Sequence, residues 1–246
     1  MIHFPTNEDM EKYYANFPFS GFEIQDSDFA TKQLDGIEGL KQLAISKELS
    51  AWKIALKNKW NDVAKAFALM MFYYDKGIPD EPYYISPGRK GQSIEYFPHF
   101  DNEHSSIKDG FDFYADIYYF KMFSTIDGIW QILNVYFNLG LTVNKVSFRN
   151  VCSKLEKIDT QTVTSLKKIF EDERYKKGKD LRNSITHHLP VGSQGTGIRR
   201  KGNATIFCIS EYTSSKQIVE IAKALLNFSI EAFKQIKNLC NKDNLS

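Results

Sequence analysis

The sequence has few cysteines, no long apolar run and almost no net charge, and each of these properties excludes a class of protein. Its three cysteines are far apart and include no C-x-x-C pair, so the sequence predicts neither a disulfide framework nor a zinc finger. No segment approaches the roughly eighteen uninterrupted apolar residues that a transmembrane helix needs. A net charge of +2 is too small for a general nucleic-acid coat protein, so a basic binding site would have to be local.

The first residues, MIHFPTNEDMEKYY, also lack the basic region and apolar stretch of a signal peptide. We therefore expect a cytoplasmic protein that has no membrane partner. Its 246 residues, of which 42% are hydrophobic and 25% charged, are typical of a globular protein with a sizeable core.

Apolar residues recur every three or four positions over residues 47–76, which indicates a long helix. These residues are Trp52, Leu56, Trp60, Val63, Phe67, Met70 and Tyr74. A weaker helix is predicted before it, at 29–45, and an irregular connection after it, at 78–109. Four more helices are predicted at 111–139, 147–157, 160–175 and 179–188, followed by a flexible Gly-rich loop at 192–203 and a short strand at 204–210. The last predicted helix, at 215–240, opens with the capping box Ser214 and Gln217.

Helix thus dominates, and the fold class is all-α, with at most a short strand or hairpin near residues 204–210. We expect a single helical domain over residues 1–246. Within it, residues 1–110 form N-terminal helices and an irregular linker, and residues 111–240 form the core bundle.

The irregular connection contains four side chains of the kinds that bind metals. They are His99, Asp101, Glu103 and His104. Their spacing fits no defined site, and exposed polar loops have the same composition, so no metal site is predicted.

A line of polar side chains follows one side of the predicted helix at 111–139. It contains Asp116, Asp127, Gln131, Asn134 and Asn138, together with Phe120 and Phe123. Two interpretations are open. The line is a solvent-facing edge, or Asp127 or Asn134 points at a functional helix, where a buried carboxylate or amide would orient a cation.

The segment LRNSITHHLP, residues 181–190, separates two kinds of side chain when it is drawn as a helix. At about 100° per residue, Arg182, Asn183 and His187 fall on one polar face together with Lys179. Leu181, Ile185 and His188 fall on the opposite face, so we expect His188 to be a packing residue. Pro190 disfavours helical geometry at Leu189, which places His187 in the last turn, where the helix dipole favours an imidazolium.

Arginine and histidine together suit RNA cleavage without a metal. Histidine can take the proton of the ribose 2′-hydroxyl or protonate the leaving oxygen, a role worth roughly 10²–10⁴-fold in rate. Arginine can hold the phosphate with two hydrogen bonds and stabilise developing charge. On spacing alone, both catalysis and a purely structural helix end remain open.

The six residues Arg182-Asn183-Ser184-Ile185-Thr186-His187 resemble the motif of the HEPN family, in which an arginine is followed a few residues later by histidine, often with a polar residue directly after the arginine. The likeness covers about residues 111–240, and the piece IEYFPHF upstream is similar to what precedes the bundle in one bacterial branch. The resemblance implies a four-helix core bundle that dimerises, and a metal-independent endoribonuclease without a cofactor.

The resemblance also implies roles for individual residues. Arg182 and His187 match the catalytic pair, Asn183 matches the supporting polar position, and His188 also satisfies the permitted spacing. Asp127 is the candidate for an acidic residue on the neighbouring helix. Many members act on RNA in toxin–antitoxin or phage-defence systems, which implies RNA, a second copy and an antitoxin protein as partners. Others are inactive and bind nucleotides or proteins.

Basic residues near the motif are candidates for contacts with RNA phosphates. Arg199, Arg200 and Lys201 lie between glycines in the predicted loop, and Lys179 follows two further lysines. For the loop residues, a solvated surface turn is the alternative interpretation.

Overall fold

The structure is a computed structural model, and it describes residues 4–25, 27–29, 39–80, 83–85, 94–96, 100–187, 196–201, 204–209 and 212–242. The chain divides into two compact units. Unit 1 contains Met1–Asn16, Ala66–Tyr119 and Lys177–Lys223, and unit 2 contains Phe17–Lys65, Phe120–Lys176 and Ala224–Ser246. Both units take residues from each side of residue 110, and the prediction of a single domain divided there stays a prediction.

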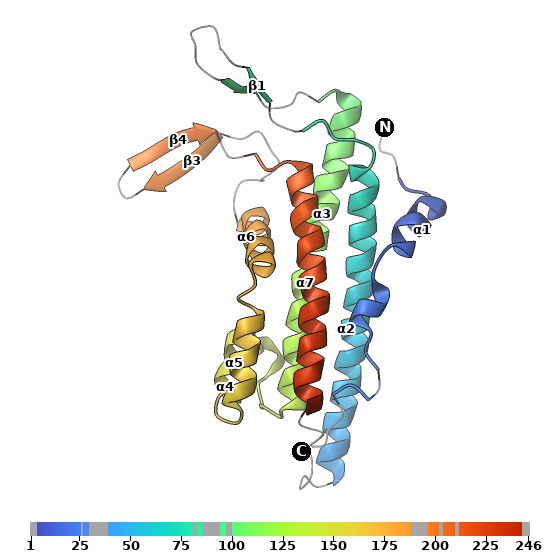
Figure 1. Ribbon diagram of the computed structural model, residues 1–246, viewed down its shortest axis with the longest axis vertical. Coiled ribbons are helices and arrows are strands. Elements are labelled where there is room, and N and C mark those ends of the chain that lie inside the picture. The colour runs from blue at the N-terminus through green and yellow to red at the C-terminus, as the bar shows by residue number, and fades with distance from the viewer. Residues whose placement is uncertain are drawn as a thin grey trace. The chain divides into compact units, whose positions relative to one another are not determined.

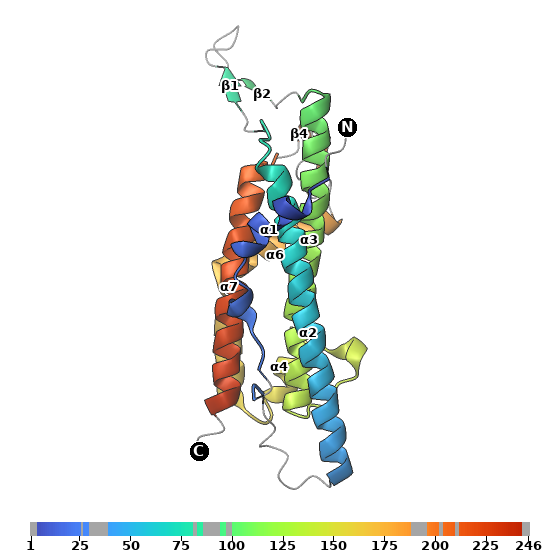
Figure 2. The same cartoon turned by 90° about the vertical axis from the view of Figure 1, so that its right-hand side faces the viewer.

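Helices make up most of the described chain (Figures 1 and 2). They are α1 (Asn7–Ala15), α2 (Gly39–Tyr74), α3 (Asn102–Tyr136), α4 (Phe148–Leu155), α5 (Thr160–Ile169), α6 (Glu173–His187) and α7 (Ser215–Lys242). The predicted all-α class is therefore confirmed. Among the described residues, no helix is both long and apolar enough to span a bilayer.

In the described part of the chain, the strands form two short antiparallel hairpins, β1 (Tyr83–Ile85) with β2 (Ile94–Tyr96) and β3 (Thr196–Lys201) with β4 (Ala204–Ile209). The strand predicted at 204–210 is β4. The flexible loop predicted at 192–203 was wrong over residues 196–201, because these pair with β4 in register, from Thr196 opposite Ile209 to Lys201 opposite Ala204. The prediction of an irregular connection at 78–109 was likewise wrong for β1, β2 and the start of α3.

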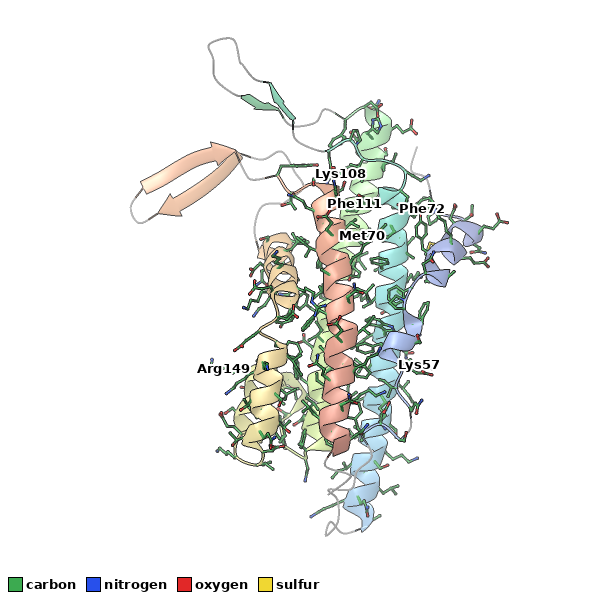
Figure 3. All side chains as sticks on the ribbon, viewed as in Figure 1. Lys57, Met70, Phe72, Lys108, Phe111 and Arg149 are labelled. Carbon is green, nitrogen blue, oxygen red and sulfur yellow. The ribbon has the colours of Figure 1, made fainter. Side chains whose placement is uncertain are left out.

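Unit 1 has a core built from the C-terminal part of α2 and the N-terminal parts of α3 and α7. Met70 and Phe111, labelled in Figure 3, are both completely buried there. Gly110 of α3 lies against the ring of Tyr73 on α2, and a Cβ at Gly110 would be 2.5 Å from that ring. The absence of a side chain at Gly110 therefore allows this close approach of the two helices.

Two adjacent tyrosines of α3 add polar contacts to the unit 1 core. Tyr118 donates its hydroxyl to the carbonyl of Ala222, at 2.8 Å, and Tyr119 donates to the carbonyl of Ile218, at 2.9 Å. Both side chains are completely buried, and burial raises the pKa of each phenol. The hydroxyls thus remain neutral donors whose partners lie on α7.

The start of α7 is held by a buried carboxylate from a distant part of unit 1. Asp80, which is 1% exposed, accepts hydrogen bonds from the Ser215 backbone N–H (2.7 Å), the Ser215 hydroxyl (2.8 Å) and the Tyr212 hydroxyl (2.9 Å). The predicted capping box is also present, because Ser214 and Gln217 each accept a backbone N–H from the other. The helix therefore begins with several of its free N–H groups satisfied.

Unit 2 has an aromatic core. Phe22 lies flat between Trp60 of α2 and Phe233 of α7, with ring centroids 4.3 Å and 4.0 Å apart. A second cluster joins α3, α4, α7 and the two ends of the α5–α6 connection, and consists of Trp130, Phe148, Phe170, Tyr175 and Phe228. These rings account for much of the aromatic content that the sequence shows.

Several helix boundaries differ from those predicted. α3 begins at Asn102 and not at 111, since Asp101 caps it by accepting the backbone N–H of His104 at 2.7 Å. α2 begins at Gly39, and Phe29 has a φ of 57°, so the weaker helix predicted from residue 29 was wrong at that residue. The break between the next two helices lies at residues 170–172, earlier than the predicted break at 176–178.

Candidate active-site helix

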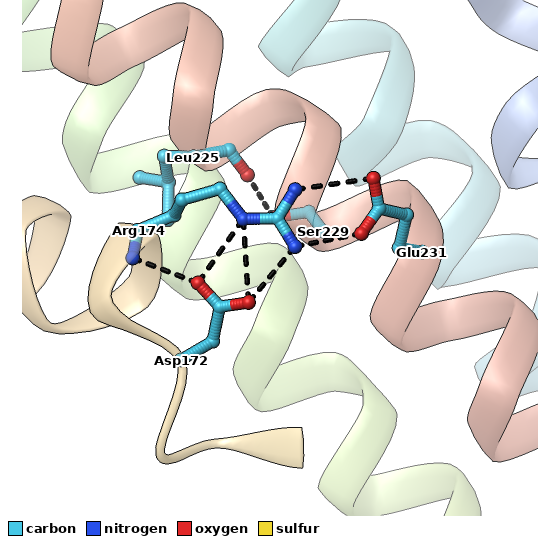
Figure 4. A network of polar contacts seen from close by, with 5 residues as sticks. All are labelled: Asp172, Arg174, Leu225, Ser229 and Glu231. Carbon is cyan, nitrogen blue, oxygen red and sulfur yellow. Dashed lines mark hydrogen bonds and ion pairs between the residues drawn. The ribbon is translucent and has the colours of Figure 1, made fainter.

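The helix that carries the motif, α6, is fixed at its first turn by an ionic network in unit 2 (Figure 4). Asp172 caps the helix by accepting the backbone N–H of Arg174 at 2.8 Å. The guanidinium of Arg174 then bonds to the carboxylates of Asp172 and Glu231, with shortest distances of 2.8 Å and 2.6 Å. These hydrogen bonds lower the pKa of both carboxyl groups and raise that of Arg174. The start of α6 is thus joined to α7 by a bidentate ion pair between Arg174 and Glu231.

Further along α6, burial follows the predicted faces only in part, because Ile185 of the expected packing face is half-buried, like residues of the polar face. Leu181 is buried at 7% exposure, whereas Lys179 and Thr186 are exposed. Arg182 and Asn183 are half-buried. The polar face is therefore partly enclosed.

The structure brings Arg182 and Asn183 together. The Nη1 of Arg182 donates to the amide oxygen of Asn183 at 3.2 Å, and Thr186 returns its hydroxyl to the Arg182 carbonyl at 2.8 Å. An amide oxygen on one nitrogen of a guanidinium restricts where the other nitrogens point. Asn183 can therefore orient the cation.

The structure describes the two histidines of the motif only in part. His187 is the last residue of α6, so it lies in the final turn, and helical geometry puts it about 140° around the axis from Arg182. The side chain of His187 and the whole of His188 lie outside the described residues. Their expected roles stay predictions.

Asp127 and Asn134 are in different environments along the polar line of α3. Asp127 is exposed in unit 2, and Arg182 belongs to unit 1. Asn134 is buried and exchanges two hydrogen bonds with the backbone of Leu141, at 3.0 Å and 3.1 Å. Asn134 therefore holds the turn after α3, a role that neither of the two interpretations of the polar line had predicted for it. The role of Asp127 stays a prediction.

The basic candidates divide by location. Lys177 and Lys179 are exposed on α6, and neither makes an ion pair with any residue that the structure describes. Arg199, Arg200 and Lys201 lie on β3, opposite Ile206, Thr205 and Ala204 of β4 in the register of the hairpin. The side chains of these three lie outside the described part of the chain, so their contact with RNA stays a prediction.

The metal-like residues near the start of α3 have a structural role. Asp101 accepts from the His104 backbone, which lowers the pKa of Asp101, and its carboxylate lies 3.0 Å from Nδ1 of His104. His99 lies outside the described residues. In the described part of the chain, no three His, Cys, Asp or Glu side chains form a group suited to a metal.

Sequence analysis missed a polar cluster on α3 in unit 1. Lys108 is 4% exposed, and its ammonium lies 2.6 Å from each carboxylate oxygen of Asp112. One turn further, Asp116 remains accessible, yet its apolar surroundings and then the like charge of Asp112 raise its pKa to about 6. A lysine four residues before an aspartate was the available signal.

Comparison with known proteins identifies the family to which the chain is similar. A family described as HEPN_Cthe2314-like HEPN matches residues 52–239, which is well over half of the chain. The match begins in α2, about sixty residues earlier than the resemblance predicted, and it includes all of α6. No curated protein and no solved structure matches the chain significantly.

Proposed function

This chain belongs to the HEPN_Cthe2314-like HEPN family, and we propose that it is a metal-independent endoribonuclease whose catalytic pair is Arg182 and His187. The proposal rests on one observation above all. The family match covers the motif helix, and within that helix the guanidinium of Arg182 is bonded to the amide oxygen of Asn183. This supports a cation that is oriented in advance for an anionic substrate.

In the proposed reaction the ribose 2′-oxygen attacks the adjacent phosphorus. His187 takes the 2′-hydroxyl proton or protonates the departing 5′-oxygen, and its place in the last turn of α6 favours the imidazolium. Arg182 binds the phosphate oxygens and stabilises the added negative charge. The P–O5′ bond breaks, and the products are a 2′,3′-cyclic phosphate and a 5′-hydroxyl.

We further propose how RNA and protein partners are held. Lys177 and Lys179 make no ion pair within the described chain and would attract the phosphate backbone, with Arg199, Arg200 and Lys201 of β3 as additional contacts. Two copies would bring two motif helices to one RNA. A toxin–antitoxin or phage-defence setting, with an antitoxin protein as partner, belongs to the same proposal.

The test is digestion of a single-stranded RNA in EDTA, followed by analysis of the product ends. We expect wild type to give cyclic phosphates, and His187→Ala or Arg182→Ala to lose about 100-fold or more of the rate. His104→Ala is the matched control, because His104 lies on α3 and contacts Asp101. His188→Ala is expected to lower stability more than rate. Magnesium-dependent cleavage, or full activity of the His187 variant, would contradict the proposal.

The alternative is an inactive HEPN domain that binds a nucleotide or a protein. The half-burial of Arg182 and its bond within its own helix favour this alternative, because such an arginine can serve the fold alone. If well-folded wild type leaves RNA intact while binding a nucleotide or a partner protein, the alternative holds.

A further inference from the structure

Unit 2 contains an open cavity of about 810 Å³ between α5, the first turn of α6 and α7, which we call the α5–α7 pocket. Its volume is within the range of ordinary ligand sites. The floor is apolar and consists of Ile169, Phe228, Ala232 and Leu239. None of the residues of the proposed RNA site lines the pocket.

The ionic network at the start of α6 bounds the pocket. Arg174, Asp172 and Glu231, which are drawn in Figure 4, all line it. The Arg174 guanidinium is also 5.8 Å from the centroid of the Phe228 ring. Because Arg174 already bonds to two carboxylates, it is not a free cation for an anionic ligand. This boundary is therefore preformed, and its one cation is already paired with two carboxylates.

Of the remaining polar groups of the pocket, Ser165 donates its hydroxyl to the Gln161 carbonyl within α5, and the others have no partner among the described residues. Gln235, Asn238 and Asn241 are presented by α7, and their amides make no hydrogen bond with any described residue. On the α5 side, Lys168 and Glu171 are exposed and make no ion pair within the described chain. The pocket thus offers three free primary amides and one free charge of each sign.

This set of groups matches a polypeptide. A primary amide provides both a donor and an acceptor, as does each peptide unit, so a row of them can satisfy an extended backbone. The apolar floor would take side chains, and the free ammonium and carboxylate would pair with opposite charges of the ligand.

Nucleic acid fits the pocket poorly. Glu171, Asp172 and Glu231 contribute three negative charges, and Lys168 and Arg174 contribute two positive charges, so the lining has a net charge of −1. A phosphate backbone would meet a net like charge and only one free cation.

We propose that the α5–α7 pocket binds an unphosphorylated peptide segment of a partner protein, with apolar side chains on the floor and one basic and one acidic residue opposite Glu171 and Lys168. The amides of Gln235, Asn238 and Asn241 hold its backbone. This binding site is separate from the proposed catalytic pair and does not depend on nuclease activity.

The probe is a phage-displayed library of random short peptides, selected on the full-length wild-type chain. An enriched peptide is synthesised with a fluorescent label, and its affinity is measured by anisotropy. We expect the variant Gln235→Ala/Asn238→Ala to bind about thirtyfold more weakly, as the loss of two ordinary hydrogen bonds predicts. Asn227→Ala is the matched control, because Asn227 is an exposed amide of α7 outside the pocket, and it should leave the affinity unchanged.

Both altered side chains are exposed, so the variant should keep the circular dichroism spectrum of wild type. As a second variant, Lys168→Glu should select peptides enriched in basic residues instead of mixed charges. The proposal is overturned if no peptide is enriched, or if enriched peptides bind the double variant and the control equally. It is also overturned if the double variant loses binding of an RNA oligonucleotide, or if it changes from dimer to monomer, since the occupant would then be RNA or a second copy.

Discussion

Replacing Asp80 by alanine should destabilise the protein far more than any surface substitution. The carboxylate is 1% exposed and accepts three hydrogen bonds, two from Ser215 and one from the Tyr212 hydroxyl. Alanine would leave three donors at the start of α7 without their acceptor, namely the Ser215 backbone N–H, the Ser215 hydroxyl and the Tyr212 hydroxyl. Removing one partner of a buried polar group costs more than the hydrogen bond itself gains.

At about 1–3 kcal/mol for each unsatisfied group, Asp80→Ala should lower the free energy of unfolding by about 3–5 kcal/mol. Loss of a negative charge at a helix N-terminus adds about 0.3–1 kcal/mol. Asp80→Asn keeps the shape and one acceptor oxygen, and should lose about 1–2 kcal/mol. Tyr212→Phe removes a single donor and leaves the carboxylate with the other two, so about 1 kcal/mol is expected.

The assay is urea unfolding followed by circular dichroism, with the free energy taken from midpoint and slope. The expected order of destabilisation is Asp80→Ala, then Asp80→Asn, then Tyr212→Phe, with similar slopes for all three. If Asp80→Ala is no more destabilising than Tyr212→Phe, the buried carboxylate does not hold the start of α7, and the reasoning fails.

Three further changes test other parts of the structure. Gly110→Ala should lower the stability of the fold by about 1–3 kcal/mol, because its new methyl group meets a tyrosine ring. Gly39→Ala is the control, because the space around Gly39 is open and no stability should be lost. Thermal unfolding of the two variants measures the difference. Asp116 has a folded-state pKa of about 6 against an ordinary 3.8, so the folded protein binds more protons between these values and loses stability as the pH rises through them. Asp116→Asn should therefore raise the melting temperature at pH 7 and not at pH 4, and an equal gain at both would contradict this. Glu231→Gln should lower the free energy of unfolding by about 1 kcal/mol, because Glu231 bonds to Arg174 through both carboxylate oxygens but is about half-exposed. A loss of stability that does not become smaller in high salt would argue against an ionic origin.

Sequence analysis predicted the elements whose signals are local. The last helix was predicted at 215–240 and found at Ser215–Lys242, because Ser214 and Gln217 form a capping box and its apolar residues repeat regularly. The hairpin strand β3 was missed although Gly202-Asn203, between the two strands, is a recognised hairpin signal. The segment that forms β3 contains a single apolar side chain, Ile198, and lies among glycines, so its composition favoured a loop.

Glycine also explains the error at the start of α3. The helix start predicted at residue 111 left Gly110 outside the helix, but Gly110 lies inside it, where its missing side chain accommodates the ring of Tyr73. The sequence alone does not tell whether a glycine allows a neighbouring helix to pack closely or marks the end of its own helix. The position of the neighbouring helix decides between the two. The true start was marked by Asp101, whose capping role was obscured by its place among metal-like residues.

In and around the candidate site, features that depend on neighbouring residues were also easier to predict than those that join distant segments. Helical geometry alone predicted that Arg182 and Asn183 share a face, and the contact between them joins neighbours on one helix. The Asp80 network joins residues that are 132 and 135 positions apart, and no local pattern indicates such a pair. The α5–α7 pocket likewise requires three elements at once, and its amides looked in the sequence like an ordinary exposed helix face.

The two buried tyrosines of α3 limit the number of ways in which α3 and α7 can pack within unit 1. The carbonyls of Ile218 and Ala222 lie one turn apart on α7, so both hydroxyls find acceptors only at particular rotations of that helix about its axis. Apolar contacts alone tolerate many similar arrangements of nearly equal energy, whereas a buried hydroxyl without an acceptor is costly. The tyrosines therefore contribute uniqueness more than stability. Without the hydroxyls, unit 1 would keep its helices and its apolar core but sample several rotations of α7, as a loosely ordered ensemble does.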